Sequence, residues 1–180
     1  MKRSFIVAAL LILMSLSASA QKTQQNYVIG FYNLENLFDI YDDPVKNDNE
    51  FLPEGKNKWT QAKYEKKLHN MAKVIRSMAD NNKRWHTILG ISEIENRLVI
   101  EDLVSQPEIA DANYEIVHYD SPDRRGVDVA LLYKPDQFTY LDSESIPFDF
   151  NSDIDFSDTD TSYFKTRDIL MVHGLIAGEH

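Results

Sequence analysis

Strand-like and helix-like segments alternate along this chain, and their order constrains the fold more than any other feature of the sequence. Tyr27 to Asn33 is a short β-branched and aromatic run, which is typical of a buried strand. A polar, loop-like stretch from Asp39 to Lys58 follows, and His86 to Ser92 is a second apolar run. Later strand candidates are residues 113–119, 126–133, 138–141 and 166–176. The order strand, helix, strand, helix and then several strands predicts an α/β (α+β) sandwich with a mixed or antiparallel sheet.

A long amphipathic helix is predicted between the first two strands. Thr60 can cap it, and apolar residues then recur at spacings of four and three. The members of this stripe are Tyr64, Leu68, Met71, Ile75 and Met78. We expect the stripe to pack into the core, and the basic residues beside it, Lys63, Lys66, Lys67, Lys73 and Arg76, to form a solvated face. A shorter helix is predicted over residues 97–105, before Pro107.

The first twenty residues have the pattern of a secretory signal. Lys2 and Arg3 precede an apolar stretch, which ends in the small residues Ala18 to Ala20. The alternative is an N-terminal membrane anchor, but the apolar stretch is shorter than the ~20 residues that span a bilayer. We therefore expect a signal peptide over residues 1–20, a mature domain over residues 21–180, and a periplasmic or secreted protein without a membrane segment after cleavage.

The amino-acid composition excludes several kinds of catalytic and metal-binding site. The 180 residues are 43% hydrophobic and 27% charged, as in an ordinary soluble domain. The chain has no cysteine, which excludes disulfides, thiolate metal sites and a thiol nucleophile. The formal net charge of -10 argues against a broad, sequence-independent grip on nucleic acid, although a local basic groove remains compatible with it.

The most acidic stretch runs from Asp136 to Asp160, with eight acidic residues and no basic one. An EF-hand starting at Asp153 would need glycine at its sixth position and glutamate at its twelfth, where the sequence has Asp158 and Phe164. We expect an acidic surface loop, with a calcium site as the alternative.

Three polar residues stand where an apolar core would exclude them. Asn33 ends the first predicted strand, Glu93 ends the second, and Asp128 interrupts the apolar run from Val127 to Tyr133. Ligand sites in open α/β sheets gather at strand ends, and a buried carboxylate needs a partner such as a metal ion. The alternative for Asn33 and Glu93 is an ordinary turn or cap residue.

Four sequence blocks carry a resemblance to a known family. They are GFYNLENLFD at residues 30–39, ISEIEN at 91–96, DRRGVDVALLYKP at 123–135 and TRDI at 166–169. In this order and spacing they resemble the N-terminal half of the endonuclease/exonuclease/phosphatase family. That family includes pancreatic-type deoxyribonucleases, abasic-site endonucleases, inositol polyphosphate 5-phosphatases and neutral sphingomyelinases. The resemblance implies the N-terminal part of a four-layer α/β/β/α sandwich and metal-dependent hydrolysis of phosphodiester or phosphomonoester bonds.

The resemblance also implies roles for three residues. Asn33 would help to bind and orient metal and phosphate, Glu93 would be the principal ligand of Mg²⁺ (or of Mn²⁺ or Ca²⁺), and Arg167 would contact phosphate. Asp128 is a separate inference, because Gly126, Asp128, Ala130 and Leu132 would share one strand face. Its carboxylate could orient a catalytic histidine, and the alternative is a satisfied carboxylate in the core.

The sequence departs from the family pattern after the arginine strand. The family continues there with a histidine, an aspartate-x-asparagine motif and an aspartate-histidine pair, and His173 comes too early for the first of these. We therefore expect a truncated, catalytically incomplete piece of an exported phosphoesterase, with an apolar sheet face left uncovered. Its partners would be a phosphate ester, with nucleic acid as one candidate, and the missing C-terminal half. The alternative is a secreted, non-catalytic binding protein that uses the acidic loop.

Overall fold

The computed structural model describes residues 26–148 and 166–176, so the predicted signal peptide and most of the acidic stretch lie outside the described residues. Six strands are described: β1 (Ile29–Leu37), β2 (Ile88–Ile94), β3 (Glu115–His118), β4 (Asp128–Tyr133), β5 (Phe138–Ile146) and β6 (Ile169–Ile176). The helices are α2 (Gln61–Asn82) and α3 (Arg97–Val104), with short 3₁₀ turns at Asn49–Phe51 and Ala110–Ala112.

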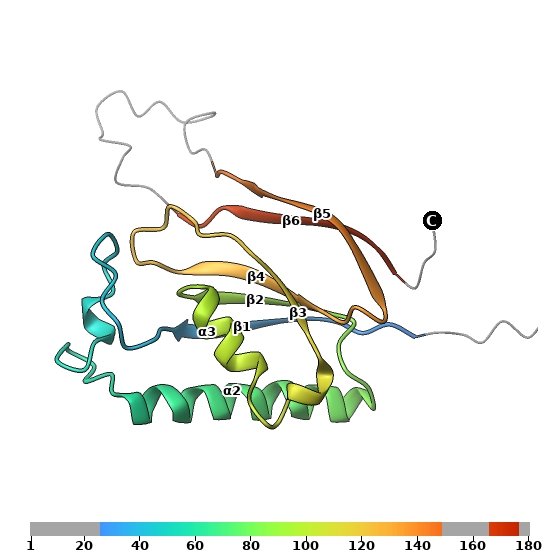
Figure 1. Cartoon of the computed structure of the whole chain (residues 1–180), viewed down its shortest axis with the longest axis horizontal. Helices are drawn as coiled ribbons and strands as arrows, with labels where there is room; N and C mark the ends of the chain where they lie inside the picture. Colours follow the sequence, from blue (N-terminus) through green and yellow to red (C-terminus); the bar gives the residue numbers. More distant parts are fainter. Residues whose placement is uncertain (1–25, 149–165, 177–180) are drawn as a thin grey trace, which may run out of the picture.

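The strands form two sheets. The larger has the order β1-β2-β4-β3, in which β1 and β2 are parallel and the other pairs antiparallel, while β5 and β6 form an antiparallel pair. Figure 1 shows α2 on one side of the four-stranded sheet and the β5–β6 pair on the other. This mixed α/β sandwich confirms the predicted fold class.

The helix-covered side of the large sheet holds the main core. Tyr64, Leu68 and Ile75 of the predicted stripe are buried there, and Met71 and Met78 pack against them. They meet side chains from β1, β2 and β4, among them Leu34, Leu89, Ile91 and Leu132, all fully buried. The apolar period of three and four residues therefore predicted the buried face of α2 correctly.

The opposite side of the sheet is only partly covered. Alternate residues of β2 and β4 turn toward β6, because successive side chains of a strand point to opposite faces. At the edge strand β1, Ile29 and Phe31 remain 69% and 68% exposed. An exposed apolar sheet face was expected from the sequence, and the described residues contain one.

One predicted loop is partly a strand. Residues 138–141 were expected to form a short strand before an acidic loop, but β5 continues to Ile146 and includes Asp142 and Glu144. Both acidic side chains are on the exposed outer pair of strands, where solvent accepts their charge. The strand prediction for residues 138–141 was therefore correct, the acidic loop was wrong for residues 142–146, and residues 149–160 of it lie outside the described residues.

Within residues 26–148 and 166–176, no helix has both the length and the apolar character needed to cross a bilayer.

Candidate functional site

The parallel strands β1 and β2 both change conformation near their carboxyl ends. Asn33 pairs with Ser92, but the register then shifts before Leu37 pairs with Ile94. Glu35, Asn36 and Glu93 adopt left-handed backbone conformations, with φ of 52°, 60° and 59°. Such conformations are unfavourable for residues other than glycine and persist where surrounding contacts hold them. The irregularity therefore marks this sheet end as a candidate site.

A lysine from α2 holds the irregular part of β1. The Lys67 ammonium donates to the backbone carbonyls of Glu35 and Asn36. Within the same turn, the Glu35 amide donates to Asn33 Oδ1 at 2.7 Å. Burial lowers the pKa of Lys67, and the charges of Glu35 and Glu93 oppose that shift. The expectation that Lys67 belongs to a solvated face was therefore wrong, because the strand end of β1 uses it as a hydrogen-bond donor.

Glu93 lies among positive charges. Arg167 Nη1 is 3.9 Å from Glu93 Oε1, and the two side chains are 29% and 21% exposed. The charge of Glu93 also acts on Lys67. Arg125 has a raised pKa, chiefly through its hydrogen bond to Asp123 and with a further contribution from Glu93. A partly exposed carboxylate thus lies near three cationic side chains from different parts of the chain, Arg167, Lys67 and Arg125.

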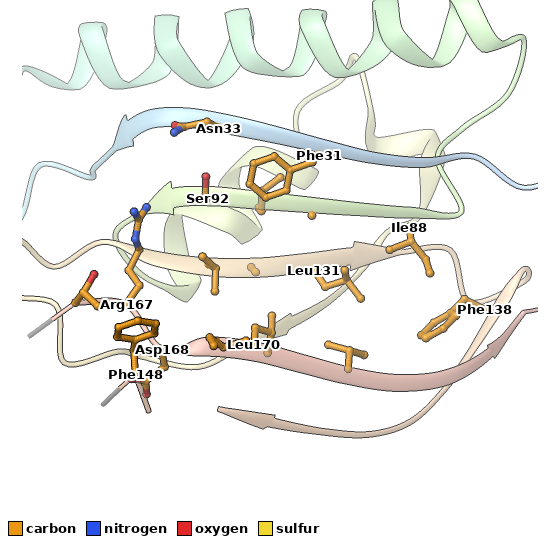
Figure 2. Close-up of a pocket in the computed structure, with 17 residues that line it drawn as sticks. Phe31, Asn33, Ile88, Ser92, Leu131, Phe138, Phe148, Arg167, Asp168 and Leu170 are labelled. Carbon is orange, nitrogen blue, oxygen red and sulfur yellow. The ribbon is translucent and has the colours of Figure 1, made fainter. Parts of the chain in front are cut away.

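A groove of about 930 Å³ runs between the two sheets, and Arg167, the partner of Glu93, lines it. Figure 2 shows Asn33, Ser92 and Arg167 at one end, with the Arg167 side chain extended toward the strands that carry the other two. The rest of the lining is mainly apolar and includes Phe31, Ile88, Leu131 and Phe138. The groove therefore combines a polar end, suited to an anion, with an apolar channel.

Asp128 lies apart from that groove lining. It is 2% exposed, and it sits across the ladder from Ile94. Its Oδ2 is 3.0 Å from His118 Nε2, and its Oδ1 accepts from the Ser121 amide at 2.9 Å and the Ser121 hydroxyl at 2.6 Å. The carboxylate does contact a histidine, His118. A catalytic role for Asp128 stays a prediction.

The same region contains a candidate metal-binding group. One donor atom each from His118, Asp120 and Asp128 lies within 4.8 Å of the others, and Asp120 is exposed. Asp128 Oδ1 accepts two hydrogen bonds from Ser121, whereas Oδ2 has one contact, with His118, and keeps a lone pair that an ion could use.

Comparison with known proteins decides the family. The model of the endonuclease/exonuclease/phosphatase family matches residues 28–180. The chain belongs to the endonuclease/exonuclease/phosphatase family. No individual curated protein matches it. Members of this family act in general on phosphate esters or nucleic acids and depend in general on divalent metal ions.

The polar end of the groove fits what this family requires of a metal site. Glu93 offers a carboxylate and Asn33 an amide oxygen, and both are the hard oxygen donors that Mg²⁺ and Mn²⁺ take. Asn33 is exposed and its Oδ1 has one hydrogen bond, which leaves a lone pair available. The family site would then comprise Glu93 and Asn33 for the ion, and Arg167 for phosphate.

Sequence reasoning missed several residues around this family site. Lys67 could have been found only from the fold, because its α2 position looks solvated. Arg125 lies within the third family block but was not singled out. Asp168, next to Arg167, lines the groove and accepts from Ser145 at 2.9 Å through Oδ2, while its buried Oδ1 has no partner. Its position after the arginine in TRDI was the available signal.

Glu95, two residues beyond Glu93, lies near acidic side chains instead of cationic ones. Glu95 accepts a hydrogen bond from the Asp39 amide at 2.7 Å. Burial, and then the charges of Asp39, Asp48 and Asp43, raise the pKa of Glu95 to about 8, although the bond from the Asp39 amide opposes this. Acidic side chains that have no role in the predicted site therefore act on Glu95, next to that site.

Proposed function

We propose that this chain binds a divalent cation, Mg²⁺ by preference, at Glu93 and holds a phosphate ester beside it for hydrolysis. The observation that carries the proposal is the pairing of Glu93 with Arg167, which itself lines the polar end of the groove. A carboxylate for the cation and a guanidinium for the phosphate are needed at neighbouring positions in a metal-dependent phosphoesterase.

In this proposal each side chain has a separate task. Glu93 and Asn33 hold the ion, whose chemistry is to polarise a phosphoryl oxygen and bring its bound water close to phosphorus. Arg167 pairs with Glu93 in the absence of substrate, and its planar donors turn to two phosphate oxygens when substrate enters. Lys67 keeps the β1 turn closed, so that Asn33 stays in place. Lys67 and Arg125 add positive charge near the developing negative charge on the phosphoryl group.

The substrate is proposed as a phosphodiester or a phosphomonoester. The apolar channel beyond the polar end suits an ester with an organic group long enough to reach Phe31 and Leu131. A nucleic acid remains the candidate polymer, and the net charge of -10 requires that such a substrate be bound locally, through the cationic end of the groove.

We also propose that the protein is exported and that its leader is removed after Ala20. The family match begins at residue 28, beyond that cleavage position, which supports a leader separate from the domain. Fractionation of the producing cells, followed by N-terminal mass spectrometry, should find Gln21 as the first residue outside the cytoplasm. An intact Met1 in the cytoplasmic fraction would contradict export.

Metal and phosphate binding should be measurable separately from turnover, because the residues proposed for them, Glu93, Asn33 and Arg167, are present.

Hydrolysis of a chromogenic phosphodiester tests the proposal, with Mg²⁺ supplied and then removed by chelation. Any turnover should require Mg²⁺, fall to background in Glu93→Gln, and persist in Glu101→Gln, a surface glutamate that pairs with Arg97. Robust turnover that survives Glu93→Gln would overturn the assignment of Glu93.

A further inference from the structure

The β3–β4 hairpin brings an imidazole and two carboxylates together. One donor atom each from His118, Asp120 and Asp128 lies within 4.8 Å of the other two. His118 is the last residue of β3, Asp120 follows it in the connecting loop, and Asp128 is the first residue of β4. We call these three side chains the hairpin group. One nitrogen and two oxygen donors that converge in this way are the ligand types of a transition-metal site.

The hairpin group is not part of the groove that holds the polar site. His118 is opposite Ala130 in the β3–β4 ladder, and Asp128 shares a strand face with Leu132, which is fully buried in the main core. No member of the hairpin group is among the residues that line the groove between the sheets. A ligand at the hairpin group would therefore occupy a site distinct from the one proposed around Glu93.

The two buried members of the hairpin group are spaced almost as two ligands of one ion would be. The side chains of His118 and Asp128 are each 3% exposed, and His118 Nε2 is 3.0 Å from Asp128 Oδ2. Two ligand atoms that bind Zn²⁺ at about 2.0–2.2 Å in a tetrahedral site are about 3.3 Å apart. An ion would replace the proton between these two atoms, and the neutral imidazole would carry its proton on Nδ1. Little rearrangement is needed.

Ser121 fixes the carboxylate of Asp128 from the other side. Asp128 Oδ1 accepts from the Ser121 amide at 2.9 Å and from its hydroxyl at 2.6 Å. These two bonds leave Oδ2 turned toward His118. Carboxylates that bind metal ions in proteins commonly carry such outer hydrogen bonds, which orient them toward the ion. Ser121 is therefore a positioning residue for this site.

The charge of the hairpin group suits a divalent cation. Among residues 26–148 and 166–176, the ion pairs give Asp128 no partner except the His118 ring and give Asp120 none. With a neutral imidazole, the group carries two negative charges, which one divalent ion would neutralise. Asp120 is exposed, so its side chain can turn toward an ion that the two buried ligands hold.

We propose that His118, Asp120 and Asp128 bind a transition-metal ion of the zinc class, with water as a fourth ligand. Imidazole favours Zn²⁺ over Mg²⁺ and Ca²⁺, which take oxygen ligands. His118 and Asp128 lie at the two ends of the loop of residues 119–127, so the ion fastens that loop at its base. The loop carries Arg125, whose charge acts on Glu93. The ion thus steadies a cation beside the proposed hydrolytic site without taking part in hydrolysis.

Zinc titration by calorimetry tests the site in the full chain, with Mg²⁺ in excess to fill the proposed site at Glu93. One Zn²⁺ should bind with a dissociation constant of about 10 μM or tighter. Ser121→Ala should weaken binding about tenfold, and Asp120→Asn should weaken it further, because a ligand is lost. The matched control is His173→Gln, at a His–Asp pair whose side chains are 62% and 69% exposed, and it should bind as the wild type does.

Nitrogen NMR of the histidine rings locates the ion in the unmodified protein. Zn²⁺ should shift the Nε2 signal of His118 and leave its Nδ1 protonated, whereas the ring signals of His69, which pairs with Glu108 on the surface, should not move. Zn²⁺ should also raise the midpoint of thermal unfolding, because it binds the folded chain, and this shift should be smaller in Asp120→Asn.

Three results would each overturn the proposal. The first is no Zn²⁺ binding up to about 1 mM, a hundred times the weakest affinity expected. The second is wild-type affinity in Asp120→Asn, and the third is a His118 Nε2 signal that saturating Zn²⁺ does not move. Asp120 is exposed and the NMR experiment needs no variant, so a Ser121→Ala protein that fails to fold leaves all three decisions available. Glu93→Gln should lose Mg²⁺-dependent hydrolysis and keep Zn²⁺ binding, so the two proposals fail separately.

Discussion

Glu93 and Glu95 are two residues apart at the end of β2, yet they lie in opposite electrostatic surroundings. Glu93 is partly exposed and 3.9 Å from Arg167, and its charge also acts on Lys67 and Arg125. Glu95 is surrounded by Asp39, Asp43 and Asp48. Side chains at i and i+2 of a regular strand share a face and would share surroundings. The left-handed conformation of Glu93 and the register shift beside it separate the two carboxylates.

The difference matters for the proposed function. A carboxylate beside cationic side chains can exchange its arginine partner for a metal ion, as proposed for Glu93. Among the described residues, the ion pairs do not include Glu95, so no such exchange is open to it. The kink at Glu93 therefore separates the proposed metal ligand from the acidic surroundings of Glu95.

The largest effect is expected from Glu93→Gln. The amide keeps the size of the side chain but loses its charge, so Mg²⁺ affinity should fall by about tenfold or more, which corresponds to about 1.4 kcal/mol. Isothermal calorimetry measures this directly. Glu101→Gln is the control and should bind Mg²⁺ as the wild type does. Unchanged Mg²⁺ affinity in Glu93→Gln would show that Glu93 is not the metal ligand that distinguishes it from Glu95.

Arg167→Met should change two affinities in opposite directions. Phosphate binding should weaken about fivefold to tenfold, because a charge-assisted bidentate contact is lost. Mg²⁺ binding should strengthen slightly, because Glu93 loses its competing partner. Titrations with inorganic phosphate and with Mg²⁺ check both. A parallel loss of the two affinities would mean that Arg167 supports the local fold rather than phosphate.

Lys67→Met should loosen the turn that holds Asn33. The variant loses two donations to backbone carbonyls, and the free energy of unfolding should fall by about 1 to 2 kcal/mol. Lys66→Met, at an exposed neighbouring position, is the matched control. Chemical denaturation gives the stabilities, and amide shifts of Glu35 and Asn36 report on the turn. Unchanged amide chemical shifts of Glu35 and Asn36 in Lys67→Met would show that Lys67 does not hold this turn.

A good part of this fold followed from the sequence, for identifiable reasons. The stripe from Tyr64 to Met78 has one period over its whole length, so its buried face was predictable. The strands near Glu93 were predictable as apolar runs, but their ends were not. Left-handed backbone at Glu35, Asn36 and Glu93 depends on contacts such as those from Lys67, and these join residues that are about thirty positions apart in the chain.

The acidic surroundings of Glu95 were not predictable for a similar reason. Asp39, Asp48 and Glu95 are ordinary loop and strand-end residues in the sequence, and only the fold lets the charges of the two aspartates act on Glu95. The sequence drew attention instead to Asp136–Asp160, where charge is dense along the chain. Density along the chain indicates solvent exposure, whereas a binding site requires convergence in space.

The smallest effect is expected at His86, at the opposite end of β2 from both glutamates. His86 is 2% exposed, and burial lowers its pKa. The unfolded chain takes up a proton near pH 6.5 and the folded chain does not, so stability is full above pH 6.5 and falls as the pH drops below it. The slope is at most about 1.4 kcal/mol per pH unit.

Urea denaturation between pH 5 and pH 8 measures that slope, and His86→Gln should have a flatter profile below pH 6.5. An equal slope in the variant would assign the pH dependence to other groups. Because no acidic side chain among the described residues pairs with His86, this comparison isolates burial from the charge effects that distinguish Glu93 and Glu95.

Site-resolved broadening of amide signals by Mn²⁺ tests the central claim most directly. In the wild type and in Glu95→Gln, a low concentration of Mn²⁺ should broaden the amide signals of Asn33 and Arg167. In Glu93→Gln that broadening should disappear. Broadening around Asn33 and Arg167 that persists in Glu93→Gln, or that disappears in Glu95→Gln instead, would contradict the assignment of Glu93 as the metal ligand of this site.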